Sequence, residues 1–333
     1  MKKTAGYFLI IAFLFLLSLV FYSIDEIFIE RTLAQVVRLE IDRGEDADSI
    51  IERLKEAGLI RNKSIAKAYI VMTGVHKEIK PGLYSLGPTY SVKEVFDRLT
   101  SGGGIAVKIY EGQTIREIAQ TLLETGIIGN AIEFERMASR FDNSFGRYKF
   151  LPKQRDVNLE GYLFPDTYKF WKSTVTEVVE EMLDDFNNKA YSQFSNLNPE
   201  EFSQIIIMAS MLEKEVRTER DMKLVSGVLW KRLEADIPLQ VDATLVYVKC
   251  DVMKLSDCRV LSNGDKQLVS PYNTYLNLGL PPGPIANPGL IAIEAVLRPQ
   301  TSSYWYYLSA RDDGRTIFAE TLDEHNANRL IYR

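Results

Sequence analysis

One strand–helix pattern occurs twice in this chain, and the second copy follows the first at a shift of 68, from Gly44 to Gly112. The alternating, strand-like segment 37–41 leads to a glycine, a helical pattern and a second glycine, and the segment 107–128 repeats this order. The matched pairs are Gly44 and Gly112, Leu54 and Leu122, Gly58 and Gly126, and Asn62 and Asn130. Because each unit is too small to bury a core alone, we expect the two copies to pack together.

A second constraint is an uncharged, apolar run from Ala5 to Ile24, directly after Lys2 and Lys3. A helix of this length, at ~1.5 Å per residue, spans about 30 Å, which matches the hydrocarbon core of a bilayer. The lysines favour the cytoplasmic side. We therefore expect residues 1–25 to form a cytoplasmic stub and a single inner-membrane anchor, with the rest in the periplasm. A cleaved signal peptide is the alternative, but its apolar stretch is normally about 7–15 residues and ends in small side chains.

Composition excludes several classes of function. The 333 residues include 40 basic and 45 acidic side chains, so the formal net charge of −5 is unlike that of a nucleic-acid-binding protein. The two histidines, His76 and His325, and two cysteines are too few ligands for the usual structural zinc site. The sequence predicts no metal and no organic cofactor. A chain of this length is expected to contain two or three domains.

The two cysteines, Cys250 and Cys258, are close together in the sequence. In an oxidising compartment a disulfide between them would close a short loop and add about 2–3 kcal/mol in the chain-entropy model. Two unpaired thiols remain the alternative. No histidine lies nearby in the sequence, which argues against a catalytic thiol.

Glu213 is an unusual carboxylate because it continues the apolar stripe of a predicted helix from about Phe202 to Val216. Burial disfavours the charged form and raises the pKa of a glutamate, and a protonated carboxyl group is what glycosidic cleavage needs as a general acid. A buried glutamate paired with an arginine for structure is the alternative. Glu215 is about 200° further round the helix, where we expect it to meet solvent.

Four further segments combine polar side chains with turn residues or aromatic rings. Prolines reduce the entropy that a loop loses when it is held in one shape, and such loops often carry function. Packed linkers and structural lids are the alternatives, and a lone capping or surface histidine is the simplest interpretation of His325. The segments are Glu160-Gly-Tyr-Leu-Phe-Pro-Asp-Thr-Tyr168, Leu239-Gln-Val-Asp-Ala-Thr244, Ser270-Pro-Tyr-Asn-Thr-Tyr275 and Gly279-Leu-Pro-Pro-Gly-Pro-Ile-Ala-Asn-Pro-Gly289.

Together with Ala209-Ser-Met-Leu-Glu-Lys-Glu215 and Glu324-His-Asn326, these segments in this order resemble the endolytic murein transglycosylases, the YceG-like or MltG family. In that family the first glutamate of the Glu-Lys-Glu motif is catalytic, and it falls on Glu213 here. The family's N-terminal part resembles LysM modules, and Ile109 to Leu122 fits that pattern. One departure is the segment Lys249 to Gln267, which looks longer than the usual connection.

The resemblance implies an α+β protein with a transmembrane helix, a LysM-like duplicated β/α domain at 36–150 and a mixed α+β catalytic domain at 151–333. It implies lytic cleavage of peptidoglycan between N-acetylmuramic acid and N-acetylglucosamine, giving 1,6-anhydro ends that terminate strand elongation. Peptidoglycan strands and penicillin-binding synthases are the expected partners. The residues expected to bind or orient the glycan are Gln240, Asp242, Tyr272, Asn273, Glu160 and Tyr162.

Two other functions stay open at this point. A hydrolytic muramidase would need a second carboxylate, for which Asp242 and Asp166 are the candidates. A non-catalytic peptidoglycan-binding protein would be consistent with the LysM-like repeat. Products without added water would exclude the first, and release of any fragment would exclude the second.

Overall fold

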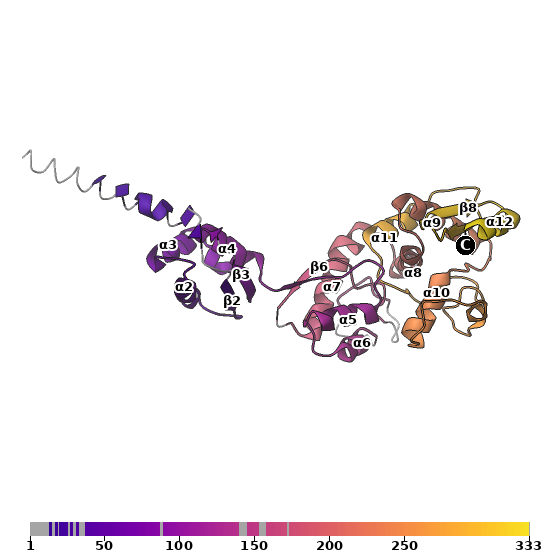
Figure 1. Ribbon diagram of the computed structural model, residues 1–333, viewed down its shortest axis with the longest axis horizontal. Helices are drawn as coiled ribbons and strands as arrows, with labels where there is room; N and C mark the ends of the chain where they lie inside the picture. The colour runs from indigo at the N-terminus through magenta and orange to yellow at the C-terminus, as the bar shows by residue number, and fades with distance from the viewer. Residues whose placement is uncertain are drawn as a thin grey trace, which may run out of the picture. The chain divides into compact units, whose positions relative to one another are not determined.

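The computed structural model describes residues 13–14, 17–18, 20–25, 27–28, 31–32, 37–86, 89–139, 145–152, 158–171 and 173–332. Helices joined by four two-stranded sheets make up the described part of the chain, in agreement with the expected α+β class (Figure 1). Most of the predicted anchor at 5–24 lies outside the described residues. Within the part that is described, no helix has both the length and the apolar character needed to cross a membrane.

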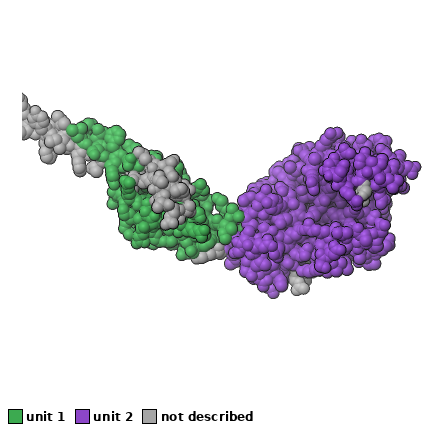
Figure 2. Space-filling view, viewed as in Figure 1, with its two compact units in different colours: residues 1–106, 169–172 green, residues 107–168, 173–333 purple. Residues whose placement is uncertain are grey.

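The chain forms two compact units, coloured separately in Figure 2. Unit 1 contains residues 1–106 and 169–172, and unit 2 contains residues 107–168 and 173–333. The first copy of the repeat therefore belongs to unit 1, whereas the second copy belongs to unit 2. The expectation that the two copies pack together stays a prediction. The division falls after Ala106, whereas the sequence predicted a domain boundary at 150.

Unit 1 is built around β2 (Val37–Ile41), which pairs antiparallel with β3 (Gly82–Leu86). Apolar side chains of the sheet and helices form one core, including Leu39, Leu54 and Phe96. The other elements of the unit are β1 (Arg31–Thr32), α2 (Ala47–Glu56), α3 (Lys63–Thr73), η1 (Val75–Lys77), β4 (Thr89–Tyr90) and α4 (Val92–Ser101). Ser91 and Glu94 form a capping box at the start of α4.

The two copies of the repeat agree down to single hydrogen bonds. Gly58 and Gly126 both adopt φ +74°, a left-handed conformation that favours glycine, after the helices α2 and α5 (Ile115–Glu124). In both copies the next two backbone N–H groups donate to one leucine carbonyl, at 2.9 and 3.4 Å, and the acceptors are Leu54 and Leu122. The duplication predicted from sequence spacing is therefore confirmed in three dimensions.

Unit 2 begins within β5 (Ile105–Lys108), which pairs with β6 (Thr167–Phe170). Its core includes a group of aromatic rings around Phe186, which lies 4.8 Å from Phe150 and 5.4 Å from Tyr162 between ring centroids. The further elements are α6 (Ala131–Ser139), α7 (Val175–Lys189), η3 (Tyr191–Phe194), α8 (Pro199–Glu215), α9 (Glu219–Glu234), α10 (Asp242–Tyr247), η4 (Val248–Val252), η5 (Asn263–Gln267), α11 (Leu290–Leu297), β7 (Tyr306–Ser309), β8 (Thr316–Ala319) and α12 (Leu322–Tyr332).

Helix α8 is the central helix of unit 2. Asn198 caps its first turn, Pro199 occupies the first helical position, and nine residues from Phe202 to Leu212 are buried. α8 packs against α9, α10 and α11. The buried residues of α8 end at Leu212. The last turn, which carries Glu213, follows them and forms hydrogen bonds with other segments of unit 2.

Candidate functional site

Glu213 lies partly buried in the last turn of α8. The backbone N–H of Gly289 donates to Glu213 Oε2 at 3.0 Å. Burial raises the pKa of Glu213, and the negative charge of Glu111 acts in the same direction, whereas the Gly289 N–H and the Lys214 ammonium lower it. One carboxylate oxygen is thus held in place, and the group is biased toward its protonated form.

The loop that opens the second repeat copy lies directly against this carboxylate. A Cβ atom placed on Gly289 would lie 2.6 Å from Glu111 Cγ and 3.5 Å from Glu213 Oε2, so both glutamates flank the same backbone position. Lys214 Nζ donates to the Gly112 carbonyl at 3.0 Å, and the Gly112 N–H donates to the Asn287 carbonyl at 2.8 Å. The repeat therefore contributes a wall of the site.

Asn287 and Glu160 connect the elements behind that wall. Asn287 Oδ1 accepts hydrogen bonds from the N–H groups of Gly161 and Leu163, both at 2.9 Å. Its Nδ2 donates to Glu160 Oε1 at 2.9 Å, and Glu160 also accepts from the Ile115 N–H at the first turn of α5. Glu160 is 2% exposed, and this burial raises its pKa well above the usual range. Its contacts are with the protein interior, as are those of the fully buried Tyr162.

The structure brings Gln240 and Asp242 together at one cavity of about 390 Å³. Gln240 is exposed at φ +57°, and its side-chain oxygen accepts from Arg232 at 3.1 Å. Asp242 begins α10 and accepts from the Tyr275 hydroxyl at 2.5 Å. Both residues line this cavity.

The other two predicted glycan residues occupy different surroundings. Tyr272 is partly buried, and its ring centroid lies 5.1 Å from that of Tyr247. Asn273 is fully buried, and its amide donates to the carbonyls of Lys266 and Leu268. Asn273 therefore holds the backbone of the loop 266–275 in place through hydrogen bonds from the protein interior, as Glu160 does for the start of α5.

Glu215 differs from the sequence-based expectation that it meets solvent. It is partly buried, it accepts a hydrogen bond from the Ala243 N–H at 3.3 Å, and it lines two cavities. One is the 390 Å³ cavity, and the other, of about 310 Å³, also includes Lys214, Asp242 and Arg259. The two cavities thus share Glu215 and Asp242, and Glu215 lies two residues along the chain from Glu213.

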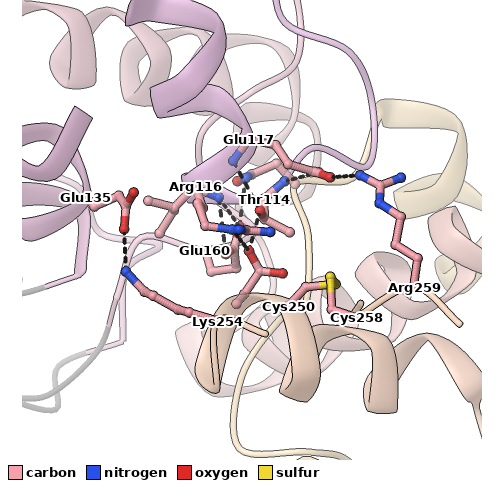
Figure 3. Close-up of polar contacts among 12 residues, drawn as sticks. Thr114, Arg116, Glu117, Glu135, Glu160, Cys250, Lys254, Cys258 and Arg259 are labelled. Carbon is pink, nitrogen blue, oxygen red and sulfur yellow. Dashed lines mark hydrogen bonds and ion pairs between the residues drawn. A yellow bond between two sulfur atoms is a disulfide. The ribbon is translucent and has the colours of Figure 1, made fainter. Parts of the chain in front are cut away.

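A disulfide joins Cys250 and Cys258. Of the two alternatives that the sequence left open, a disulfide or two unpaired thiols, the disulfide is therefore correct. The loop it closes and the residue after it contact the second repeat copy (Figure 3). Asp251 accepts from Thr114 at 2.8 Å and Arg116 at 3.2 Å, and burial raises the pKa of this carboxyl. Further ion pairs join Lys254 to Glu135 and Arg259 to Glu117, at 2.9 and 2.7 Å. We call the segment 250–259 the disulfide clasp. It forms a wall of the 310 Å³ cavity.

Within the described part of the chain, no group of three or more histidine, cysteine, aspartate or glutamate side chains is arranged to hold a metal ion.

The profile of the YceG-like family matches residues 39–330. The chain belongs to this family. It is 29% identical to the endolytic murein transglycosylase of Bacillus subtilis, over 91% of this chain and 87% of the relative. It is 28% identical to the endolytic murein transglycosylase of Streptococcus pneumoniae D39, over 92% of this chain and 60% of the relative.

A crystal structure of a YceG-like protein from Listeria monocytogenes is also similar to this chain. Its TM-score is 0.57 at 28% identity, and the match covers 88% of this chain and 99% of that one. The YceG-like fold therefore extends over both units described above.

Sequence reasoning missed three contributors to this YceG-like site: Glu111, Asn287 and Asp251. Glu111 directly precedes Gly112 in the second repeat copy, and nothing in that local pattern indicates its place beside Glu213. Asn287 was visible only as one member of the rigid loop 279–289. An asparagine directly before a proline in such a loop was the available signal, because its side chain often satisfies nearby backbone groups.

Proposed function

We propose that this chain is an endolytic lytic transglycosylase that cleaves the bond between N-acetylmuramic acid and N-acetylglucosamine in peptidoglycan strands. The names of its Bacillus and Streptococcus relatives support this activity. The observation that carries the proposal is the Glu213 carboxyl group, which burial biases toward the protonated form while the Gly289 N–H fixes one of its oxygens. A single such group suffices for cleavage without water.

The reaction uses Glu213 twice. Its carboxyl proton passes to the bridging oxygen as the bond to the muramyl C1 breaks. The resulting carboxylate then takes the proton of the muramyl C6 hydroxyl, and that oxygen closes onto C1 to form a 1,6-anhydro ring. The proton returns to Glu213, and no water is consumed. The Gly289 N–H lies at the N-cap of α11 and stabilises the intermediate carboxylate, because a helix N-terminus favours negative charge.

Six other residues have proposed roles in substrate recognition. Gln240, Asp242 and Tyr272 contact the glycan directly, which is consistent with their partial or full exposure. Asn273, Glu160 and Tyr162 act from the protein interior by fixing the loops that carry the contacting groups. This second set are positioning residues, so their substitution is expected to change stability together with activity.

The decisive test is Glu213→Gln in the full chain, with anhydro-ended fragments measured by mass spectrometry. Loss of general acid–base catalysis should lower the rate by about 100-fold or more. Glu200→Gln, in the exposed first turn of the same helix, is the matched control. Retained activity in Glu213→Gln would move the acid elsewhere, first to Glu215 or Glu160. A wild-type protein that binds sacculi and releases nothing would instead be a non-catalytic binding protein.

Hydrolysis is the second candidate, because Glu111 lies beside Glu213 and could act as the second carboxylate that muramidases use. The earlier candidates have other partners: Asp166 pairs with Lys189 at 2.5 Å, and Asp242 accepts from Tyr275. A muramidase product is heavier than the anhydro product by one water. The masses of the new ends on intact strands therefore decide between the two reactions.

The proposal includes an inner-membrane anchor at residues 1–25, with both units in the periplasm. The apolar run at 5–24 supports the anchor, and the Cys250–Cys258 disulfide supports an oxidising compartment. The protein should stay in the membrane pellet after an alkaline wash, and a chain that starts at residue 37 should be soluble. The LysM-like segment at 36–150 would then hold strands near their penicillin-binding synthases, where cleavage terminates elongation. Co-purification with a synthase tests that partnership.

A further inference from the structure

The 390 Å³ cavity extends the site away from Glu213, into the C-terminal part of unit 2. It starts at Glu215 and Asp242, and its other walls come from Arg232 of α9, from β7 and from α12. The proposed glycan contacts Gln240 and Asp242 account for part of its lining, but the proposed lytic reaction gives no role to its cations or its aromatic side chains. Its chemistry therefore calls for a separate explanation.

The most unusual group in the cavity is Arg232, a guanidinium that is only 6% exposed. It donates to the carbonyl oxygens of Pro238 and Trp305 and to the amide oxygen of Gln240, all of which are uncharged. Within the described chain it forms no ion pair. A buried cation without a negative partner is costly, and an anionic ligand would offset that cost.

Two further cations line the same cavity. Lys266 Nζ lies 4.8 Å above the centre of the Tyr275 ring, and Arg329 is exposed on α12. Neither side chain forms an ion pair with another described residue. The carboxylates Glu215 and Asp242 also line the cavity, and both are shared with the 310 Å³ cavity. The cavity thus offers both signs of charge.

Aromatic surfaces complete the cavity. Tyr306 and His325 stack with ring centroids 5.3 Å apart and planes 26° from parallel, and Tyr275 and Tyr307 also line the walls. Such surfaces pack against aliphatic portions of a ligand while nearby cations hold its anionic groups. Without its peptide the glycan carries one carboxylate, on the lactyl group of each muramyl residue, and no ammonium group. It would therefore leave most of the charged groups of this cavity without an oppositely charged partner.

We propose that this cavity binds the peptide substituent of a muramyl residue next to the cleavage site, so that the enzyme prefers peptide-bearing strands to bare ones. This proposal rests on the proposed function. A stem peptide carries carboxylates and, where its third residue is a diamino acid, an ammonium group. Its carboxylates lie toward Arg232, Lys266 and Arg329, and its ammonium group lies toward Glu215 and Asp242. The substrate class is thereby narrowed to strands that keep their peptides.

The test compares two preparations of the same strands, one intact and one stripped of peptides by an amidase. The full wild-type chain should show a higher kcat/KM on intact strands, by about fivefold or more, the size expected for one or two partly exposed ion pairs. Arg329→Glu should reduce this ratio toward one. Arg311→Glu carries the same charge change on an exposed residue outside the cavity and should keep the ratio.

Equal wild-type rates on the two preparations would overturn the peptide subsite and leave the lytic activity intact. Failure to cleave either preparation would overturn the proposed function instead. In that case a binding measurement tests whether the cavity is a peptide subsite. The synthetic tripeptide L-alanyl-γ-D-glutamyl-diaminopimelate is titrated into the Glu213→Gln chain, and the chemical shifts of the protein are followed by NMR. Shifts at Tyr306 and His325 that vanish in Arg329→Glu support the subsite, and absence of shifts overturns it.

Discussion

The backbone N–H of Gly289 and the side chain of Glu213 form a hydrogen bond of 3.0 Å, and Glu111 packs against the same glycine. Three segments distant in sequence therefore meet at one carboxyl group: the end of α8, the rigid loop 279–289 and the start of the second repeat copy. The electrostatic balance at Glu213 depends on all three, so it can be changed from each of them separately.

Glu111→Gln should lower the pKa of Glu213, because it removes a neighbouring negative charge that raises it. A general acid works only while protonated, so the loss of activity at high pH should begin at a lower pH in this variant. The measurement is the pH dependence of kcat/KM on peptidoglycan strands. The other charge among the described residues that acts on the pKa of Glu213 is the Lys214 ammonium, on the same helix.

Lys214→Met provides the control of opposite sign. The Lys214 ammonium lowers the pKa of Glu213, so its removal should move the same limb of the pH profile to higher pH. Shifts of the two variants in the same direction would show that the profile reports a group other than Glu213.

Much of the fold was readable from local sequence signals. The glycine pairs of the repeat are the clearest case, because a glycine that ends a helix in the left-handed conformation is determined by residues within a few positions. Signals of this kind depend on neighbours in the chain, and the structure confirms them.

The site was only partly predictable because its decisive contacts join distant residues. Glu111 and Glu213 meet across the body of unit 2, and the bonds of Asn287 to Gly161 and Leu163 span more than a hundred residues. Pattern and spacing also do not distinguish a polar side chain that faces a ligand from one that organises a loop. Asn273 and Gln240 stood in similar polar turns, yet one is fully buried and the other is exposed.

The disulfide clasp should stabilise unit 2. A Cys250→Ser, Cys258→Ser double variant should lose about 2–3 kcal/mol of unfolding free energy, because its unfolded chain gains the freedom of the opened loop. Urea unfolding with and without dithiothreitol measures this loss. The reductant should destabilise the wild type and leave the double variant unchanged. Equal sensitivity of both proteins would show that the reductant acts elsewhere.

The duplicated glycines allow a matched comparison between the two units. Gly58→Ala and Gly126→Ala should each lower the free energy of unfolding by about 1–2 kcal/mol, because both residues adopt φ +74°, which is strained for alanine. An added Cβ would meet no atom within 4 Å at either position, so no steric clash adds to this loss. The strain is therefore of the backbone alone and should be similar in both copies. Gly129→Ala is the control, since that glycine also has open space around it and no left-handed φ. Thermal unfolding of the three variants tests this, and a large loss in Gly129→Ala would contradict it.

Glu160 should make the stability of unit 2 depend on pH. Its pKa is raised in the folded protein by burial, so between the unfolded and folded pKa values the native state binds more protons than the unfolded chain. The stabilisation is fully present below the unfolded pKa and is lost as pH rises through the folded pKa. Glu160→Gln cannot titrate, so its unfolding free energy should depend less steeply on pH over that window.

The same substitution should lower the stability of unit 2 at acidic pH. The amide of the variant carries two N–H donors where the protonated carboxyl group carries one O–H donor, and an additional buried donor left without an acceptor costs about 1–3 kcal/mol. Urea unfolding from pH 4 to pH 8 separates the two effects, because the loss is constant whereas the titration is not. Parallel curves of unfolding free energy against pH for the wild type and the variant would contradict this prediction. They would show that Glu160 has the same pKa in the folded and unfolded protein, so that its carboxyl group is not held protonated by burial.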